Sequence, residues 1–129
     1  MRTADQHKRN NEKEYSYNLS ELVALSNGSN EFVIEMIDIF VKSSAEILLQ
    51  IKKAVENNDW EKVSSQAHKA IPSFHFMGLK MFSDELRFIE TNALNPDEQA
   101  KIKEMMYFID TQMNTVFEDL KQELPKFKI

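Results

Sequence analysis

One histidine, His68, is best suited by type and position to do chemistry. Apolar residues around it recur at steps of three and four, which indicates one buried helix face; they are Trp60, Val63, Ala67, Ala70 and Phe74. At about 100° per residue, His68 falls well over a quarter turn from the centre of that face, so we expect it to face water. An exposed neutral imidazole can attack phosphorus and hold a phosphoryl group on a ring nitrogen. An ordinary surface histidine is the alternative.

The outward side of this helix forms the surface that a phosphoryl donor would meet. It also carries Ser64, Pro72 and His75. Pro72 has no N–H to donate to the His68 carbonyl, so we predict a kinked or loosened helix and an open approach to the ring. The alternative is that the helix ends near Ile71. Lys69 points about 100° further round and is either a source of positive potential or simply a solvated charge.

Metal binding and enzyme catalysis are both disfavoured at this position. Imidazoles at positions 68 and 75 lie about 10 Å apart along a straight helix, and neither has Asp or Glu four residues on. No Gly-rich phosphate loop and no Ser-His-Asp pattern is readable. Because no second catalytic group is near His68 in the sequence, we do not expect an enzyme in its own right.

The composition restricts the class of protein. The chain has 129 residues, of which 42% are hydrophobic and 29% charged, typical of one soluble domain with a core. A net charge of −5 disfavours nucleic acid as the partner. No apolar run approaches the roughly 20 residues of a membrane span, and residues 1–14 lack the apolar core of a secretory signal. There is no cysteine, which is compatible with the cytoplasmic location that we expect.

Two glycines and three prolines in the whole chain favour helices with short connections. Apolar periodicity predicts a short helix and then longer helical segments, at 19–25, 31–57, 60–77, 79–93 and 97–123. Segment 31–57 is either one kinked helix or two, Asp59 is a predicted N-cap, and Pro125 is expected to close the last helix. We therefore predict an all-α fold: an up-down antiparallel four-helix bundle with a short extra N-terminal helix over one end. Residues 1–16 are predicted to be disordered, 17–124 to form the bundle, and 125–129 to be a frayed tail.

Three apolar side chains fall off the buried faces of their helices: Phe76, Met81 and Phe88. Exposed together, they would form a docking patch. Covered by the N-terminal helix, they would be ordinary core.

The segment around His68 resembles the histidine-containing phosphotransfer (HPt) domain, whose familiar string is AHKLKGSS, then two or three variable residues, then an apolar residue and Gly. Here the string is AHKAIPSF at 67–74, with Met77-Gly78 after it. Further matching pieces lie before and after it: LSEL at 19–22, Gly28, Phe32, Phe40, NDW at 58–60, Leu79, Leu86 and Glu90. The resemblance covers roughly residues 17–121.

The resemblance implies a bundle that accepts a phosphoryl group from the aspartate of a response-regulator receiver domain and passes it to another receiver. His68 matches the phosphorylated histidine, the domain has no kinase site or cofactor of its own, and Mg²⁺ is held by the receiver. Two residues depart from the family pattern: Ile71 replaces a lysine that helps neutralise the phosphoryl group, and Pro72 replaces a glycine that gives the partner close access. The missing lysine removes a charge-assisted contact, for which Lys69 or a protonated His75 can partly substitute.

Two functions from different classes follow from this resemblance. The first is a phosphorelay intermediate with His68 as acceptor and with Ser64, Ile71, Pro72, His75 and Phe76 as the docking surface. The second is a module that docks a receiver or helical partner without carrying phosphate, an alternative that the Ile71 substitution leaves open. A purely structural four-helix domain is a third hypothesis.

Overall fold

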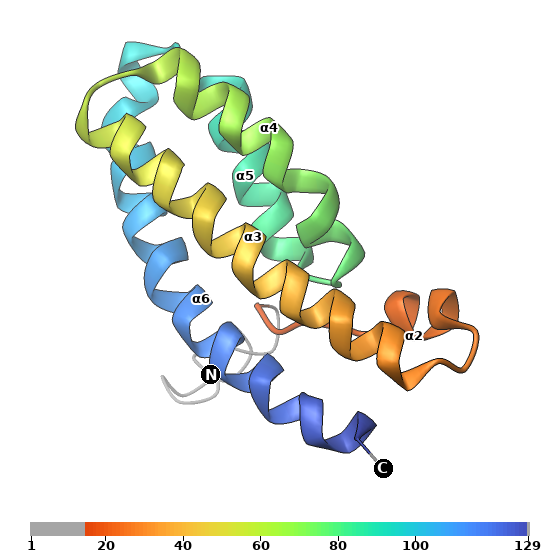
Figure 1. Cartoon of the computed structure of the whole chain (residues 1–129). Helices are drawn as coiled ribbons and strands as arrows, with labels where there is room; N and C mark the ends of the chain where they lie inside the picture. The colour runs from red at the N-terminus through yellow and green to blue at the C-terminus, as the bar shows by residue number, and fades with distance from the viewer. Residues whose placement is uncertain (1–14, 129) are drawn as a thin grey trace, which may run out of the picture.

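The computed structural model describes residues 15–128 and has the predicted all-α architecture (Figure 1). Its helices are α2 (Ser20–Ser26), α3 (Asn30–Glu56), α4 (Trp60–Phe76), α5 (Lys80–Asn92), the 3₁₀ turn η1 (Pro96–Glu98) and α6 (Gln99–Phe127). The four long helices alternate in direction, and the short α2 lies beside the N-terminal end of α3 (Figure 1). No helix in this described part of the chain is long and apolar enough to cross a membrane. The predicted bundle with an extra N-terminal helix is confirmed.

The helix boundaries follow from capping. The Ser29 hydroxyl accepts the Phe32 N–H at 3.2 Å and begins α3. The Asp59 carboxylate accepts the Lys62 N–H at 3.3 Å and begins α4, as predicted. Segment 31–57 is one helix, because the hydroxyl of Ser44 bonds back to a carbonyl one turn earlier and does not start a new helix.

The apolar faces of α2 to α6 meet in a single core. Its largest fully buried side chains are Phe74, Phe82, Leu22, Ile37, Ile51, Met77, Leu79, Leu86, Ile89, Ile102, Ile109 and Met113. The ring of Phe74 lies at the centre, edge-on to Phe40 and Phe82 with centroid distances of 5.4 and 6.3 Å. Burial of this face fixes the rotation of α4 and leaves the opposite face to solvent.

Two prolines, Pro72 and Pro125, lie inside helices, and neither ends its helix. Helix α4 continues through Pro72 to Phe76, so the alternative of an end near Ile71 is wrong. The proline is on the exposed face, where water can serve the carbonyl that lost its N–H partner. Pro125 does not close the last helix, because α6 continues to Phe127 and that ring packs against the core.

The segment 15–18 forms a strap across α5 and α6. The ring of Tyr15 lies edge-on to Phe82 and Phe108, and its hydroxyl bonds to the Glu85 carboxylate. The Tyr17 hydroxyl donates to Glu123 Oε1 at 2.6 Å. Tyr15 therefore lies in the packed part of the molecule, although the sequence predicts it within the disordered segment 1–16; residues 1–14 of that segment are outside the described residues.

The Tyr17–Glu123 bond is reflected in the acidity of both groups. Burial, together with the bond to Glu123, raises the pKa of Tyr17. The same bond lowers the pKa of Glu123, because the donated hydrogen favours the ionised carboxylate. The strap is thus held by a charge-assisted contact as well as by ring packing.

The turn between α4 and α5 touches the same strap. The Asn18 N–H donates to the Met77 carbonyl at 2.9 Å. Gly78 has φ of +73°, and a Cβ built on it would lie 2.5 to 2.7 Å from atoms of Asn18. Only glycine fits this position. The close contact between Gly78 and Asn18 fixes the turn, and the turn sets the position of α5 along the axis of α4.

The three off-stripe apolar residues have a mixed environment. Phe76, Met81 and Phe88 are half-buried, and both phenylalanine rings pack against the core. The Lys101 ammonium lies 4.6 Å from the centroid of the Phe88 ring. They are therefore neither a fully exposed docking patch nor fully buried core.

Candidate functional site

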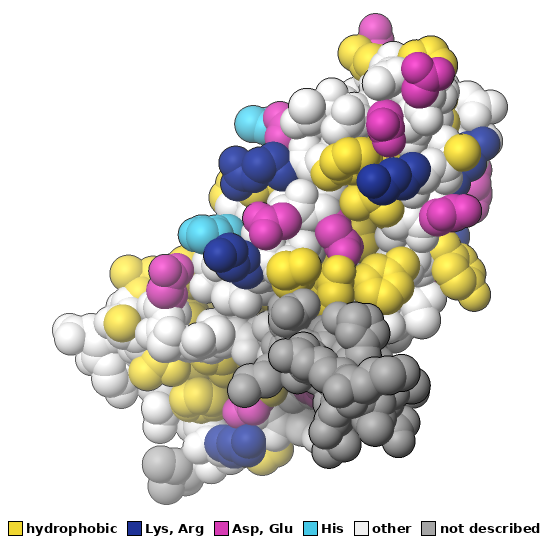
Figure 2. All heavy atoms as spheres, turned by 180° about the vertical axis from the view of Figure 1, so that it is seen from behind, with side chains coloured by type: hydrophobic (Ala, Val, Ile, Leu, Met, Phe, Trp, Pro, Cys, Tyr) yellow, Lys and Arg dark blue, Asp and Glu magenta, His cyan; other side chains and the backbone are white. Residues whose placement is uncertain are grey.

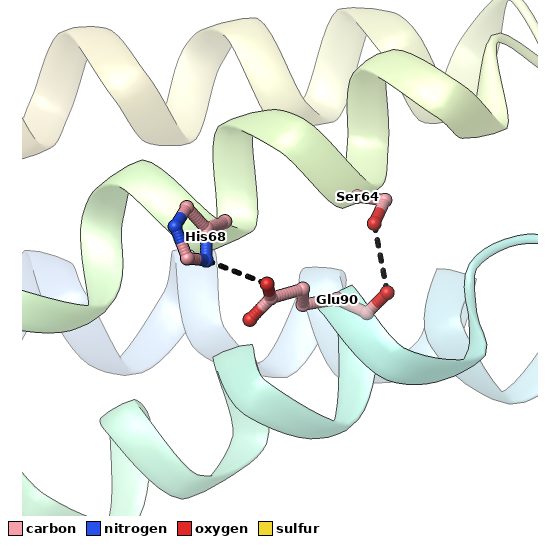
Figure 3. Close-up of polar contacts among 3 residues, drawn as sticks. All are labelled: Ser64, His68 and Glu90. Atoms are coloured by element: carbon pink, nitrogen blue, oxygen red, sulfur yellow. Dashed lines mark hydrogen bonds and ion pairs between the residues drawn. The ribbon is translucent and has the colours of Figure 1, made fainter.

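The side chain of His68 stands on the exposed face of α4, as predicted, and is 72% exposed. Its Nδ1 lies 2.6 Å from Oε1 of Glu90, which comes from the neighbouring helix α5 (Figure 3). The carboxylate is more enclosed than the ring, with 30% of its side chain exposed. A nucleophile that is open to solvent therefore has one fixed polar partner.

This contact assigns different roles to the two ring nitrogens. When Glu90 is ionised, its carboxylate can only accept a hydrogen bond, so Nδ1 then carries the hydrogen and donates it to Glu90. On a neutral ring, Nε2 then keeps its lone pair and faces away from the carboxylate (Figure 3). The arrangement provides a nucleophilic nitrogen, and a carboxylate beside the other nitrogen to stabilise positive charge on the ring.

Ser64, one turn before His68 on α4, contacts the same residue of α5. Its hydroxyl donates to the main-chain carbonyl of Glu90 at 2.8 Å, and the side chain is partly buried (Figure 3). Glu90 is thus held at its backbone by one residue of α4 and at its carboxylate by another. The hydroxyl of Ser64 points to α5, whereas the sequence analysis predicted that Ser64 contributes to the partner-docking surface.

A shallow depression of about 490 Å³ lies beside the imidazole. It is lined by Glu61, Ser64, Ser65, His68, Lys69, Glu90 and Leu94. Lys69 supplies the one ammonium of this lining, against the carboxylates of Glu61 and Glu90. An incoming phosphoryl group would therefore meet little net positive charge here.

The other predicted surface residues lie outside the depression. Ile71 is half-buried and packs against the core, while Pro72 and His75 are exposed further along α4. Figure 2 shows histidine, basic and acidic side chains close together on the face opposite that of Figure 1. The structure thus places Ser64 and Lys69 in the lining of the same depression as His68, but not Ile71, Pro72 or His75.

The sequence offers no second catalytic group near His68, and the structure places the Glu90 carboxylate beside its ring. Glu90 appeared in the sequence analysis only within the family resemblance, and Glu61 and Leu94 were not singled out. A usable signal existed: His68 and Glu90 are equally far from the turn residue Leu79, eleven residues before and after it. In an antiparallel helix pair with a tight turn, such positions are level with each other.

A second concave surface lies between α3 and α6. It has a volume of about 380 Å³ and is lined by Lys52, Val55, Glu56, Asn58, Lys103, Met106, Tyr107 and Asp110. Lys52 and Asp110 form an ion pair at 3.7 Å, and no imidazole is among the lining residues. Within residues 15–128, no group of three or more His, Cys, Asp or Glu side chains is placed to hold a metal ion.

Comparisons with known proteins identify the family. No curated protein and no solved structure matches the chain significantly. The chain does match the family model of the Hpt domain over residues 35–124, well over half of its length. Hpt domains are phosphocarrier modules without kinase activity, and they interact with the receiver domains of response regulators. The chain belongs to the Hpt domain family and takes part in phosphotransfer in two-component signalling.

Proposed function

We propose that this domain is a phosphohistidine intermediate, in which His68 accepts a phosphoryl group from the aspartate of one receiver domain and passes it to another. The observation that carries the proposal is the exposed ring, whose Nδ1 lies 2.6 Å from Glu90 Oε1 and whose Nε2 points away from that carboxylate (Figure 3). The exposure of the ring supports the proposal, because a receiver must reach this nitrogen. The expected location is the cytoplasm.

The transfer is a displacement at phosphorus. The Nε2 lone pair forms the N–P bond as the bond between phosphorus and the aspartyl oxygen breaks, and the aspartate leaves as a carboxylate. The ring becomes positively charged, and the Nδ1 hydrogen remains bonded to the Glu90 carboxylate, which stabilises that charge. Transfer to the second receiver is the reverse of these steps, so Glu90 contributes by orienting the ring rather than by moving a proton.

The partner surface surrounds this nitrogen. Lys69 is the nearest ammonium in the depression, and we assign to it the electrostatic part that Ile71 cannot supply. Pro72 and His75 extend the exposed face along α4 for docking. Mg²⁺ would be held by the receiver, and this domain would contribute no cofactor.

The lack of net positive charge in the depression favours a second candidate function, that of a docking module which binds a receiver but carries no phosphate. Two carboxylates and one ammonium line it, so a bound phosphoryl group gains little electrostatic stabilisation. The two functions differ in one observable, a covalent label on His68.

The deciding experiment mixes the domain with a phosphorylated receiver and Mg²⁺ and looks for an acid-labile, base-stable label. We expect label on the wild type and on His75→Gln, which removes another exposed histidine of the same helix, and none on His68→Gln. Receiver binding by the wild type with no label would favour the docking module. Label that persists on His68→Gln would show that the acceptor lies elsewhere.

A further inference from the structure

We propose that Ser64 is a positioning residue for phosphotransfer: its hydroxyl holds the last turn of α5 so that the Glu90 carboxylate meets Nδ1 of His68. The inference rests on the proposed function, because it concerns how the acceptor ring is oriented. It assigns to Ser64 a role inside the domain instead of a contact with the partner.

The position of Glu90 in its helix explains why such a contact is needed. Helix α5 ends at Asn92, so the residue four positions after Glu90 lies outside the helix. Carbonyls in the last turn of a helix lack a partner within it and require another donor. The Ser64 hydroxyl supplies that donor at 2.8 Å, from the helix that carries the acceptor.

The two contacts together define the orientation of Glu90. Ser64 and His68 are one turn apart on α4, so they lie on the same side of it. One bonds the backbone of Glu90 and the other its carboxylate, at 2.8 and 2.6 Å (Figure 3). A glutamate side chain has several rotatable bonds, so fixing its backbone limits the positions that its carboxylate can reach. Loss of the Ser64 hydrogen bond therefore frees the last turn of α5, and a smaller fraction of molecules then has the His68 Nδ1 bonded to Glu90.

The adjacent serine is a matched control. Ser65 also lines the depression, but its hydroxyl bonds to the Lys62 carbonyl within α4 at 3.2 Å. Ser65 is exposed, and among the described residues its hydroxyl makes no hydrogen bond to α5. Ser65→Ala therefore removes a hydroxyl from the same surface without releasing Glu90.

The first test measures the ring directly. In the full chain with ¹⁵N-labelled histidine, chemical shifts of Nδ1 and Nε2 at a pH where the ring is neutral report which nitrogen carries the hydrogen. We expect His68 to carry it on Nδ1 in the wild type, in Ser64→Thr and in Ser65→Ala, and to shift toward Nε2 in Ser64→Ala and in Glu90→Gln. An unchanged shift pattern in Ser64→Ala would overturn the proposal, even if the domain lost stability.

The second test measures transfer from a phosphorylated receiver. We expect Ser64→Ala to slow the reaction about two- to fivefold, the loss of one ordinary hydrogen bond. In the Glu90→Gln background, Ser64→Ala should slow it no further, because the contact acts through that carboxylate. Fully additive effects would contradict the proposal. If His68 took no label at all, the proposed function would fail, whereas the tautomer measurement would still decide the role of Ser64.

Discussion

The two faces of α4 share seventeen residues but differ in what they contact. One face carries Val63, Ala67, Ala70 and Phe74, which are at most 1% exposed. The other carries His68, which is 72% exposed and has one partner from α5. A single helix therefore keeps the packing of the domain separate from its chemistry by rotation alone. Substitutions on the first face should change unfolding, and substitutions on the second should change transfer.

The largest effect is expected on the buried face. Phe74→Ala removes a ring packed between Phe40 and Phe82 and leaves a cavity, which should lower the free energy of unfolding by about 3–5 kcal/mol. His75→Ala on the exposed face should change it by no more than about 0.5 kcal/mol. Urea denaturation followed by circular dichroism measures both. Equal losses for the two variants would contradict the separation of the two faces.

The second largest loss of stability is expected in the turn that follows α4. Gly78→Ala places a Cβ against the backbone of Asn18 in a left-handed conformation, and we expect a loss of about 2–4 kcal/mol. Gly28 is also left-handed but has open space around it, so Gly28→Ala should lose only about 1 kcal/mol. The difference between the two denaturation midpoints measures the strap contact. Similar midpoints for Gly78→Ala and Gly28→Ala would mean that Asn18 can move away from the added Cβ at little cost.

On the exposed side, Glu90→Gln tests the partner of the acceptor ring. The amide is neutral and can also donate to Nδ1, so it no longer fixes the hydrogen on that nitrogen, and we expect transfer to slow about three- to tenfold with little change in unfolding. Rapid-mixing measurements of label transfer from the receiver give the rate. A rate equal to that of the wild type would remove Glu90 from the mechanism and leave only the exposure of the ring.

A half-buried glutamate of α5, Glu85, and an exposed glutamate of α6, Glu104, extend the comparison to pH. Burial raises the pKa of Glu85, and the hydrogen bond from Tyr15 offsets part of this. A carboxyl with a raised folded-state pKa stabilises the fold when protonated, so this contribution is present at low pH and is lost as the pH rises through that pKa. Glu85→Gln should therefore reduce the fall in stability as the pH rises above the usual carboxyl range, and Glu104→Gln is the exposed control. Urea midpoints across this rise in pH measure it, and identical slopes for all three proteins would contradict the assignment.

The smallest effect is expected at the groove between α3 and α6. Tyr107 is 78% exposed and lines this groove, far round the bundle from the acceptor. Tyr107→Ala should leave both the rate of labelling and the affinity for the receiver unchanged. A clear loss of affinity in this variant would place part of the receiver contact on α6 and end the assignment of function to the α4 side alone.

Much of the fold could be predicted because each helix carries its own apolar period. The end of α6 was the exception: Pro125 reads as a stop, but Phe127 gains burial against the core and the helix continues. At the site, the exposure of His68 followed from the angle between it and the apolar stripe. The contact with Glu90 did not, because it depends on two helices at once.

By itself, the sequence determined a helical chain whose buried stripes force one imidazole outward, since periodicity is a property of each helix alone. Tertiary structure decided that Glu90 reaches that imidazole and that the Ser64 hydroxyl donates to the Glu90 carbonyl. Such contacts depend on the rotation and axial shift between α4 and α5. Core packing and the Gly78 turn set both, and no local pattern of residues encodes them.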